Sequence, residues 1–161
     1  MNTTQANRRQ FALAGLAALA LPAGALAQVQ AQGQANSVQV EVWKSPSCGC
    51  CKDWIAHMEK SGFRFTVHET GNTAVRQRMR IPLALGSCHT AVIGRYAIEG
   101  HVPAKDVQRL LREKPEAVGL TVPGMPAGSP GMEVPDGTVA PYDVELVAVD
   151  GSTSIYAHHG P

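Results

Sequence analysis

Three of the chain's four cysteines stand together in CGCC (48–51), between two segments of different periodicity. Before them, apolar and polar residues alternate through VQVEVW (38–43), which predicts a strand. After them, KDWIAHMEK (52–60) places its apolar residues at helical spacing and is followed closely by a helix-ending glycine. A second alternating run, FRFTVH (63–68), comes next. The sequence therefore predicts a β–α–β unit with three thiols at its first strand-to-helix junction.

The rest of the chain predicts elements in an order that returns the fourth cysteine, Cys88, to this junction. These elements are a short helix between Asn72 and Pro82, an antiparallel strand pair over TAVIG and YAIEGH (90–101), a helix over VPAKDVQRLLREKP (102–115) and a hairpin about Asp150-Gly151 (142–159). The order is that of a thioredoxin-like α/β domain, with a mixed sheet and flanking helices. In that layout the loop before the third strand lies beside the cysteine turn, so Cys88 should face the other three.

Two further segments have a distinctive composition. Residues 119–141 are dense in Gly and Pro and contain two methionines, which predicts a long loop without regular structure between the domain body and the C-terminal β-hairpin. The arginines of the short helix, Arg76, Arg78 and Arg80, are expected to form a solvated face. These features complete the predicted fold class: a thioredoxin-like mixed sheet with a long Gly/Pro/Met loop and a C-terminal hairpin.

The first residues have the pattern of an export signal. Arg8-Arg9 precedes a weakly hydrophobic run that ends in Ala25-Leu26-Ala27, a small-x-small cleavage pattern. The paired arginines indicate the twin-arginine route and a periplasmic destination. The alternative is a transmembrane anchor, for which an apolar run of about 17 residues interrupted by proline is short. We therefore predict a signal peptide at 1–27, a disordered leader at 28–37 and one folded metal-binding domain at 38–161, with no membrane span in the mature chain.

The charge of the mature chain argues against polyanionic partners. Removing the two arginines of the signal from 14 basic residues leaves 12, against 13 acidic residues, so the net charge is about −1. A near-neutral chain has no electrostatic footprint for nucleic acid or for an anionic membrane. Neither is predicted as a partner.

Export makes disulfides the first interpretation of four cysteines. Bridges between Cys50 and Cys51, or between Cys48 and Cys50, would be strained. The remaining options are a Cys48–Cys51 bridge together with a Cys50–Cys88 bridge, or no disulfide at all. The C-x-x-C spacing at a helix start also suits a thiol–disulfide oxidoreductase. Against that activity, two further thiols would share the site, and the proline that shields such sites is absent.

Metal binding is the second interpretation. Thiolates select soft ions such as Cu(I) or zinc, or iron–sulfur clusters. Adjacent cysteines can scarcely converge on one tetrahedral zinc ion, but each thiolate can bridge two Cu(I) ions. An iron–sulfur cluster stays an alternative, although its usual cysteine spacings do not occur. Further candidate ligands are soft or borderline donors outside the turn: His89, His101, Met125 and Met132. The other histidines are expected at the surface (His57, His68) or at a frayed terminus (His158, His159).

Four separated motifs, SPSCGCCKDW, SCHTAVIG, EGHVPA and GLTVPGMPAGSPGME, resemble the CopG-like family of periplasmic copper-resistance proteins. The resemblance runs from about Val38 to Tyr156. It implies a thioredoxin-like fold, a multinuclear Cu(I) cluster and a role in copper handling outside the cytoplasm. By position, the implied cysteine ligands are Cys48, Cys50, Cys51 and Cys88.

The predicted function is therefore periplasmic copper binding, with several Cu(I) ions per chain and other periplasmic copper-handling proteins as partners. The alternatives are a thiol–disulfide oxidoreductase of the same fold, and a structural zinc or disulfide domain that binds proteins. Copper redox activity would be an extension of the first function. No substrate pocket or electron partner can be identified in the sequence, so no enzyme is predicted.

Overall fold

The computed structural model describes residues 37–161. The predicted signal peptide (1–27) lies outside the described residues, as does the predicted leader (28–37) except for its last residue. Among the described residues, no helix is long and apolar enough to cross a membrane.

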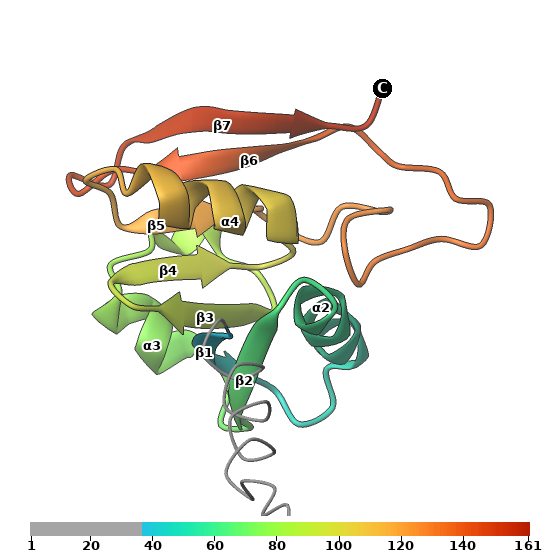
Figure 1. The fold of residues 1–161 in the computed structure, drawn as a ribbon, viewed down its shortest axis with the longest axis horizontal. Coiled ribbons are helices and arrows are strands. Elements are labelled where there is room, and N and C mark those ends of the chain that lie inside the picture. The colour runs from blue at the N-terminus through green and yellow to red at the C-terminus, as the bar shows by residue number, and fades with distance from the viewer. Residues whose placement is uncertain (1–36) are drawn as a thin grey trace, which may run out of the picture. The chain divides into compact units, whose positions relative to one another are not determined.

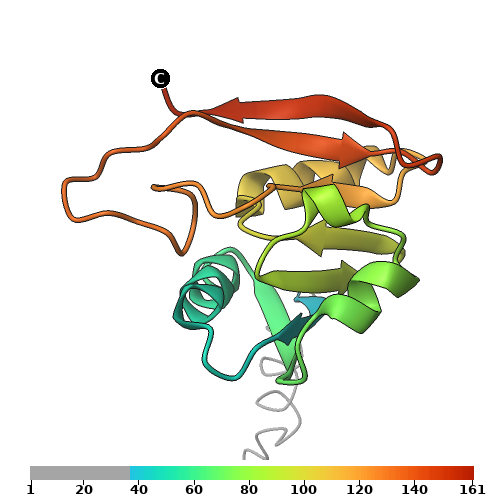
Figure 2. The same ribbon diagram turned by 180° about the vertical axis from the view of Figure 1, so that it is seen from behind.

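The domain is a single seven-stranded mixed sheet with helices on both faces (Figures 1 and 2). The elements in chain order are β1 (Val38–Lys44), α2 (Gly49–Glu59), β2 (Phe63–His68), α3 (Thr73–Arg78), the 3-10 turn η1 (Leu83–Leu85), β3 (His89–Ile93), β4 (Tyr96–Glu99), α4 (Ala104–Glu113), β5 (Gly119–Thr121), β6 (Tyr142–Val147) and β7 (Thr153–His159). The strand order is β2-β1-β3-β4-β5-β6-β7. This confirms the predicted α/β class, the β–α–β opening and the C-terminal hairpin.

The alternating strands place the core on the two faces of the sheet. On one face, Trp54 and Met58 of α2 and Leu110 of α4 pack with strand residues such as Val42 and Ile98 in one buried cluster. On the other face, a smaller cluster lies under α3 and η1 and consists of Ile81, Ala97 and Val147. The opposite placement of α3 and α4 can be followed by comparing Figures 1 and 2.

One strand was not predicted. Residues 119–121 form β5, which pairs in parallel with β4 and antiparallel with β6. The expectation that 119–141 contains no regular element is wrong for these three residues, because both neighbouring strands supply hydrogen-bonding partners from elsewhere in the chain. Gly119 fits this position because a Cβ there would lie 1.7 Å from the carbonyl oxygen of Ala97. Through β5, the C-terminal hairpin becomes part of the main sheet.

The register between β1 and β3 positions the candidate site. These strands are antiparallel neighbours, and Lys44, the last residue of β1, pairs with His89, the first residue of β3. The chain that leaves β1 and the chain that enters β3 therefore lie at the same edge of the sheet. The first carries the cysteine turn and the second carries Cys88.

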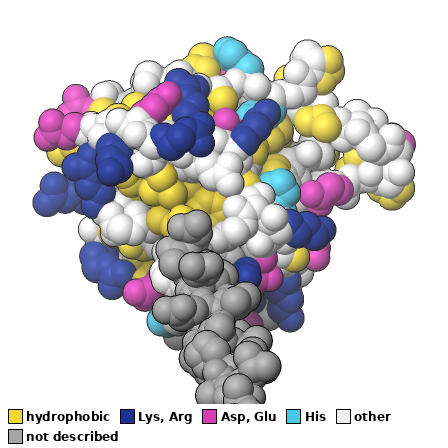
Figure 3. Space-filling model, viewed as in Figure 1, with side chains coloured by type: hydrophobic (Ala, Val, Ile, Leu, Met, Phe, Trp, Pro, Cys, Tyr) yellow, Lys and Arg dark blue, Asp and Glu magenta, His cyan; other side chains and the backbone are white. Residues whose placement is uncertain are grey.

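Surface charge is mixed on the face shown in Figure 3. Lys and Arg side chains occur there among Asp and Glu side chains, with apolar surface between them. The 14 basic and 13 acidic residues of the full sequence agree with this balance.

Candidate metal-binding site

The four cysteines meet at the amino-terminal end of α2. Cys48 precedes the first turn of the helix, Cys50 and Cys51 lie in that turn, and Cys88 directly precedes β3. The Sγ atom of Cys50 is 3.6 Å from that of Cys48 and 3.8 Å from that of Cys88. All four sulfur atoms lie within 4.8 Å of one another. The predicted approach of Cys88 to the cysteine turn is confirmed.

The four sulfur atoms are not chemically equivalent. Cys48 and Cys51 form a disulfide, whereas Cys50 and Cys88 carry free thiols. Of the bridges that the sequence left open, the Cys48–Cys51 bridge is present and the Cys50–Cys88 bridge is not. Because the thiolate is the form of cysteine that binds metals, a site made of all four cysteines requires that this bridge first be reduced.

Two histidines extend the cluster on the Cys88 side. The Sγ atom of Cys88 is 3.1 Å from Nε2 of His101 and 3.3 Å from Nδ1 of His89. The other ring nitrogen of His101, Nδ1, donates to the carbonyl oxygen of Pro130 at 2.8 Å. This bond leaves the Nε2 lone pair of His101 facing the thiol. A hydrogen bond from the second ring nitrogen to a carbonyl is the usual support of a metal-binding histidine.

The environment of His89 is different. Its side chain is fully buried, its ring lies 4.3 Å from that of Trp54, and its Nε2 has no hydrogen-bond partner among the described residues. Burial, with a smaller contribution from nearby His101, lowers the pKa of His89 to about 3. The structure thus brings both histidines to Cys88, but only His101 has the second hydrogen bond that orients a ligand.

Burial also sets the protonation of the other groups. Loss of solvent, with a smaller contribution from the neighbouring Cys50, raises the pKa of Cys88 to about 12. Burial lowers the pKa of His101, against a smaller opposite effect of its bond to Pro130. A neutral imidazole therefore lies against a protonated thiol at neutral pH. A soft ion that binds Cys88 must displace that proton.

The two methionines of the long loop lie in different surroundings. Met125 is 53% exposed and lines a small cavity of about 350 Å³ together with Cys88. Met132 is half-buried, and its hydrogen bonds come from its main chain, with Ser129 and Gly128. Met125 therefore borders an opening to Cys88. Metal ligation by either thioether stays a prediction.

A buried ion pair that the sequence did not predict lies beside Cys88. Arg76, expected on a solvated face, is only 12% exposed and pairs with the fully buried Glu99 at 2.8 Å. The expectation was wrong because α3 packs this side chain inward against the sheet. Glu99 offers the one signal that could have indicated the pair, since it is the only charged residue in the four-residue strand β4.

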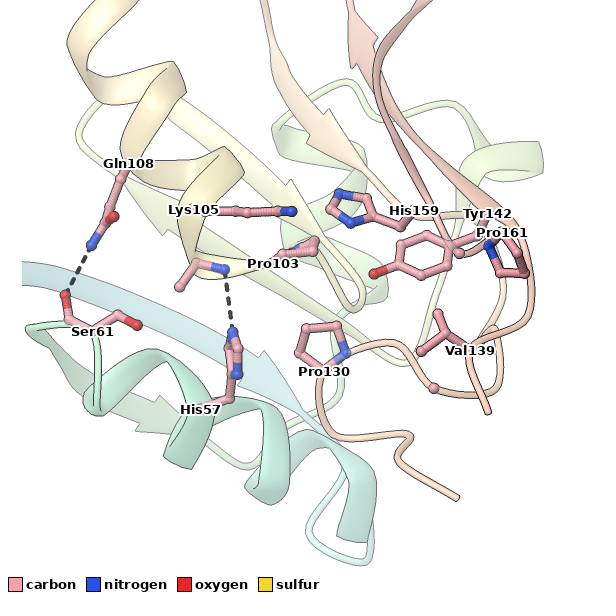
Figure 4. Close-up of a pocket in the computed structure, with 13 residues that line it drawn as sticks. His57, Ser61, Pro103, Lys105, Gln108, Pro130, Val139, Tyr142, His159 and Pro161 are labelled. Atoms are coloured by element: carbon pink, nitrogen blue, oxygen red, sulfur yellow. Dashed lines mark hydrogen bonds between the residues drawn. The ribbon is translucent and has the colours of Figure 1, made fainter. Parts of the chain in front are cut away.

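A separate cavity of about 730 Å³ opens between α2, α4 and the long loop (Figure 4). In its walls, His57 accepts a hydrogen bond from the main-chain N–H of Ala104, and Gln108 donates to the carbonyl oxygen of Ser61. Pro130 lines this cavity as well, but no cysteine is among the lining residues. The cavity therefore shares a wall with the cysteine site without containing any of its sulfur atoms.

Two further histidine expectations need correction. His57 is half-buried rather than a free surface residue, and burial lowers its pKa. His159 is not at a frayed end: it closes β7, is 12% exposed, and its Nε2 lies 2.7 Å from the carboxylate of Asp106. In both cases the contact comes from α4, which is distant in the sequence.

The fold and this site define an α/β protein with a compact set of soft sulfur and imidazole donors. A family described as "Protein of unknown function, DUF411" matches residues 85–132, a stretch that includes Cys88 but not the cysteine turn. Two solved structures, described as "Copper resistance protein copG", Form 1 and Form 2, match the chain over a longer range. They are 44% and 45% identical to it, and both have a TM-score of 0.72.

These matches cover 77% and 76% of this chain and 98% of each copG structure. No curated protein matches the chain. The chain belongs to the CopG-like family of copper-resistance proteins.

Proposed function

We propose that this chain is a periplasmic copper-binding protein that holds several Cu(I) ions on its reduced cysteines, Cys48, Cys50, Cys51 and Cys88. The observation that carries the proposal is the convergence of four sulfur atoms within 4.8 Å of one another. Thiolates prefer Cu(I), and each can bridge two ions. Sulfur pairs 3.6 and 3.8 Å apart are closer than twice a metal–thiolate bond of about 2.3 Å, so one ion can contact both.

The proposal includes ligands outside the cysteines. His101 is the first candidate, because its Nδ1 bond to Pro130 leaves the lone pair of Nε2 directed at the Sγ atom of Cys88, 3.1 Å away. His89, Met125 and Met132 remain further candidates, of which Met125 is suited to contact ions that enter through the cavity at Cys88. We interpret the β2-β1-β3-β4 part of the sheet as thioredoxin-like. Export by the twin-arginine route and exchange with other periplasmic copper-handling proteins complete the proposal.

The test is copper uptake without air. Reduced protein is expected to bind more than one Cu(I) per chain, measured by metal analysis after gel filtration. Protein that keeps the Cys48–Cys51 disulfide is expected to bind fewer ions, because two of its four sulfur atoms are occupied. One ion or fewer per chain, with all four thiols shown to be reduced, would contradict the proposal.

The Cys48–Cys51 disulfide at the start of α2 favours a second candidate function, thiol–disulfide exchange. The variant Cys50→Ser separates the two functions, because it keeps the 48/51 pair and removes a bridging thiolate. An oxidoreductase should retain insulin-reducing activity in this variant. If the protein binds copper instead, the variant should bind fewer Cu(I) ions than the wild-type chain. Neither the wild-type chain nor the variant should then reduce insulin.

A further inference from the structure

The residue that precedes Cys88 is held at both its N–H and its carbonyl oxygen by the side chains of other residues, one of them fully buried. The N–H of Ser87 donates to Oε1 of Glu99 at 2.7 Å, and its carbonyl oxygen accepts from the guanidinium of Arg76. Asn72 donates to the same carbonyl at 3.2 Å. Both peptide groups of Ser87 are therefore fixed by residues of α3 and β4, which flank the loop that carries Cys88.

Arg76 and Glu99 also bind each other, so the contacts form one closed network. Nε of Arg76 donates to Oε1 of Glu99 at 2.8 Å, and the hydroxyl of Thr90 donates to Oε2 of the same carboxylate. Glu99 is fully buried and Arg76 is 12% exposed. Every hydrogen-bonding oxygen of the carboxylate thus has a partner, and one of those partners is the main chain next to Cys88.

The free energy of folding does not by itself explain why this ion pair is buried. Removing two charges from water costs several kcal/mol per ion, so a buried ion pair is on average no more stabilising than apolar residues of the same volume. What an apolar pair could not do is bind the N–H and C=O of Ser87. The loop has further contacts with the long loop, since the hydroxyl of Ser87 donates to the carbonyl oxygen of Gly124 and the N–H of Gly124 donates to the carbonyl oxygen of Gly86. These bonds do not reach the N–H or the carbonyl oxygen of Ser87.

We propose that Arg76 and Glu99 are positioning residues that hold the Cys88 thiol against the cysteine turn. The purpose assigned to this positioning, completion of the Cu(I) site, rests on the proposed function. The geometric part stands without copper, because it concerns only the 3.8 Å approach of Cys88 Sγ to Cys50 Sγ. Loss of the Arg76 contacts should let the loop move. The effective concentration of the Cys88 thiol at the Cys50 thiol should then fall.

The thiol approach can be measured without metal. In full-length protein with Cys48→Ser and Cys51→Ser, only Cys50 and Cys88 of the four cysteines remain. Equilibration in glutathione redox buffers then gives the equilibrium constant for the Cys50–Cys88 disulfide. Adding Arg76→Met should lower this constant about tenfold, because small displacements reduce effective concentration steeply. Arg76→Lys keeps the positive charge opposite Glu99, so its equilibrium constant should lie between that of the parent and that of Arg76→Met.

The control is Arg109→Met, which removes the exposed Arg109–Glu113 pair of α4 and leaves the Ser87 contacts intact. This control should leave the constant within about twofold of the parent. If Arg76→Met has a native circular dichroism spectrum and a constant as high as the parent, or if Arg109→Met lowers it equally, the positioning role is wrong. If Arg76→Met does not fold, Arg76→Lys decides: a value equal to the parent overturns the proposal.

The effect on copper binding is measured separately, on the chain with all four cysteines reduced. Arg76→Met should bind fewer Cu(I) ions than the wild-type chain, with Arg76→Lys partly restored. If the wild-type chain itself binds one ion or fewer, the proposed function fails while the glutathione measurement still decides the positioning role. If copper binds normally in Arg76→Met despite a lowered disulfide constant, positioning is not what completes the metal site.

Discussion

Burial keeps several histidines of this protein neutral when it is folded. Loss of solvent is the main cause that lowers the pKa of His57, His89 and His101. In the unfolded chain the same imidazoles return to a pKa of about 6.5. Below that pH the unfolded state therefore binds protons that the folded state does not, and acidification favours unfolding.

His89 should dominate this response because its folded-state pKa is about 3. Between pH 6.5 and pH 5 its contribution should lower the free energy of unfolding by about 2 kcal/mol. The measurement is urea unfolding of the metal-free protein at several pH values, with His89→Phe for comparison. That variant should lose less stability on acidification, and an unchanged pH dependence would show that His89 is not the responsible group.

The long loop is the element that joins the cysteine turn to the rest of the site. Gly131 packs so closely on the start of α2 that a Cβ there would lie 2.6 Å from the carbonyl oxygen of Cys50 and 2.6 Å from the nitrogen of Trp54. The preceding residue, Pro130, accepts the hydrogen bond from His101. Two neighbouring residues of the loop therefore contact both the sulfur side and the imidazole side of the site.

Gly131→Ala should separate the loop from α2. The matched control is Gly137→Ala, because both glycines have positive φ, 83° and 72°, but a Cβ at Gly137 meets nothing within 4 Å. Both changes carry the conformational cost of about 1 kcal/mol. Gly131→Ala should cost a further 1–3 kcal/mol or so, because main-chain atoms must move. Denaturant unfolding measures the difference, and equal costs would mean that the loop does not press on α2.

At the scale of the whole molecule, the sheet creates the site by its register. Pairing of Lys44 with His89 brings the start of α2 and the loop before β3 to one edge, although Cys50 and Cys88 are 38 residues apart in the chain. In the structure this site carries the Cys48–Cys51 bridge. In the proposed function, copper binding uses the same sulfur atoms as the disulfide, so the two should oppose each other.

The free energy of unfolding should reflect this competition between copper binding and the disulfide. Opening the Cys48–Cys51 bridge, whose residues are three apart in sequence, should cost roughly 2 kcal/mol by the chain-entropy estimate for so short a loop. Anaerobic Cu(I) should more than restore this loss in the reduced protein, since ligands that bind only the folded state stabilise it. Thermal unfolding of oxidised and reduced protein, with and without Cu(I), tests this. An equal copper-induced gain in both forms would contradict shared use of the sulfurs.

Local patterns were sufficient to predict the β–α–β opening, the antiparallel pair β3–β4, helix α4 and the C-terminal hairpin. Each depends on a periodicity or a turn that lies within a few residues. The approach of Cys88 was also predictable, because it follows from the order of these elements.

Other features depend on partners that are distant in the chain. Strand β5 has three residues and exists because β4 and β6 lie on either side of it. Arg76 is buried because Glu99 and Ser87 stand opposite, and only the sheet brings them there. The choice of Cys48–Cys51 as the bridge, and of His101 rather than His89 as the better-oriented imidazole, likewise depends on tertiary contacts. Periodicity encodes which face of an element is buried, but the identity of the opposite group is decided only when the chain has folded.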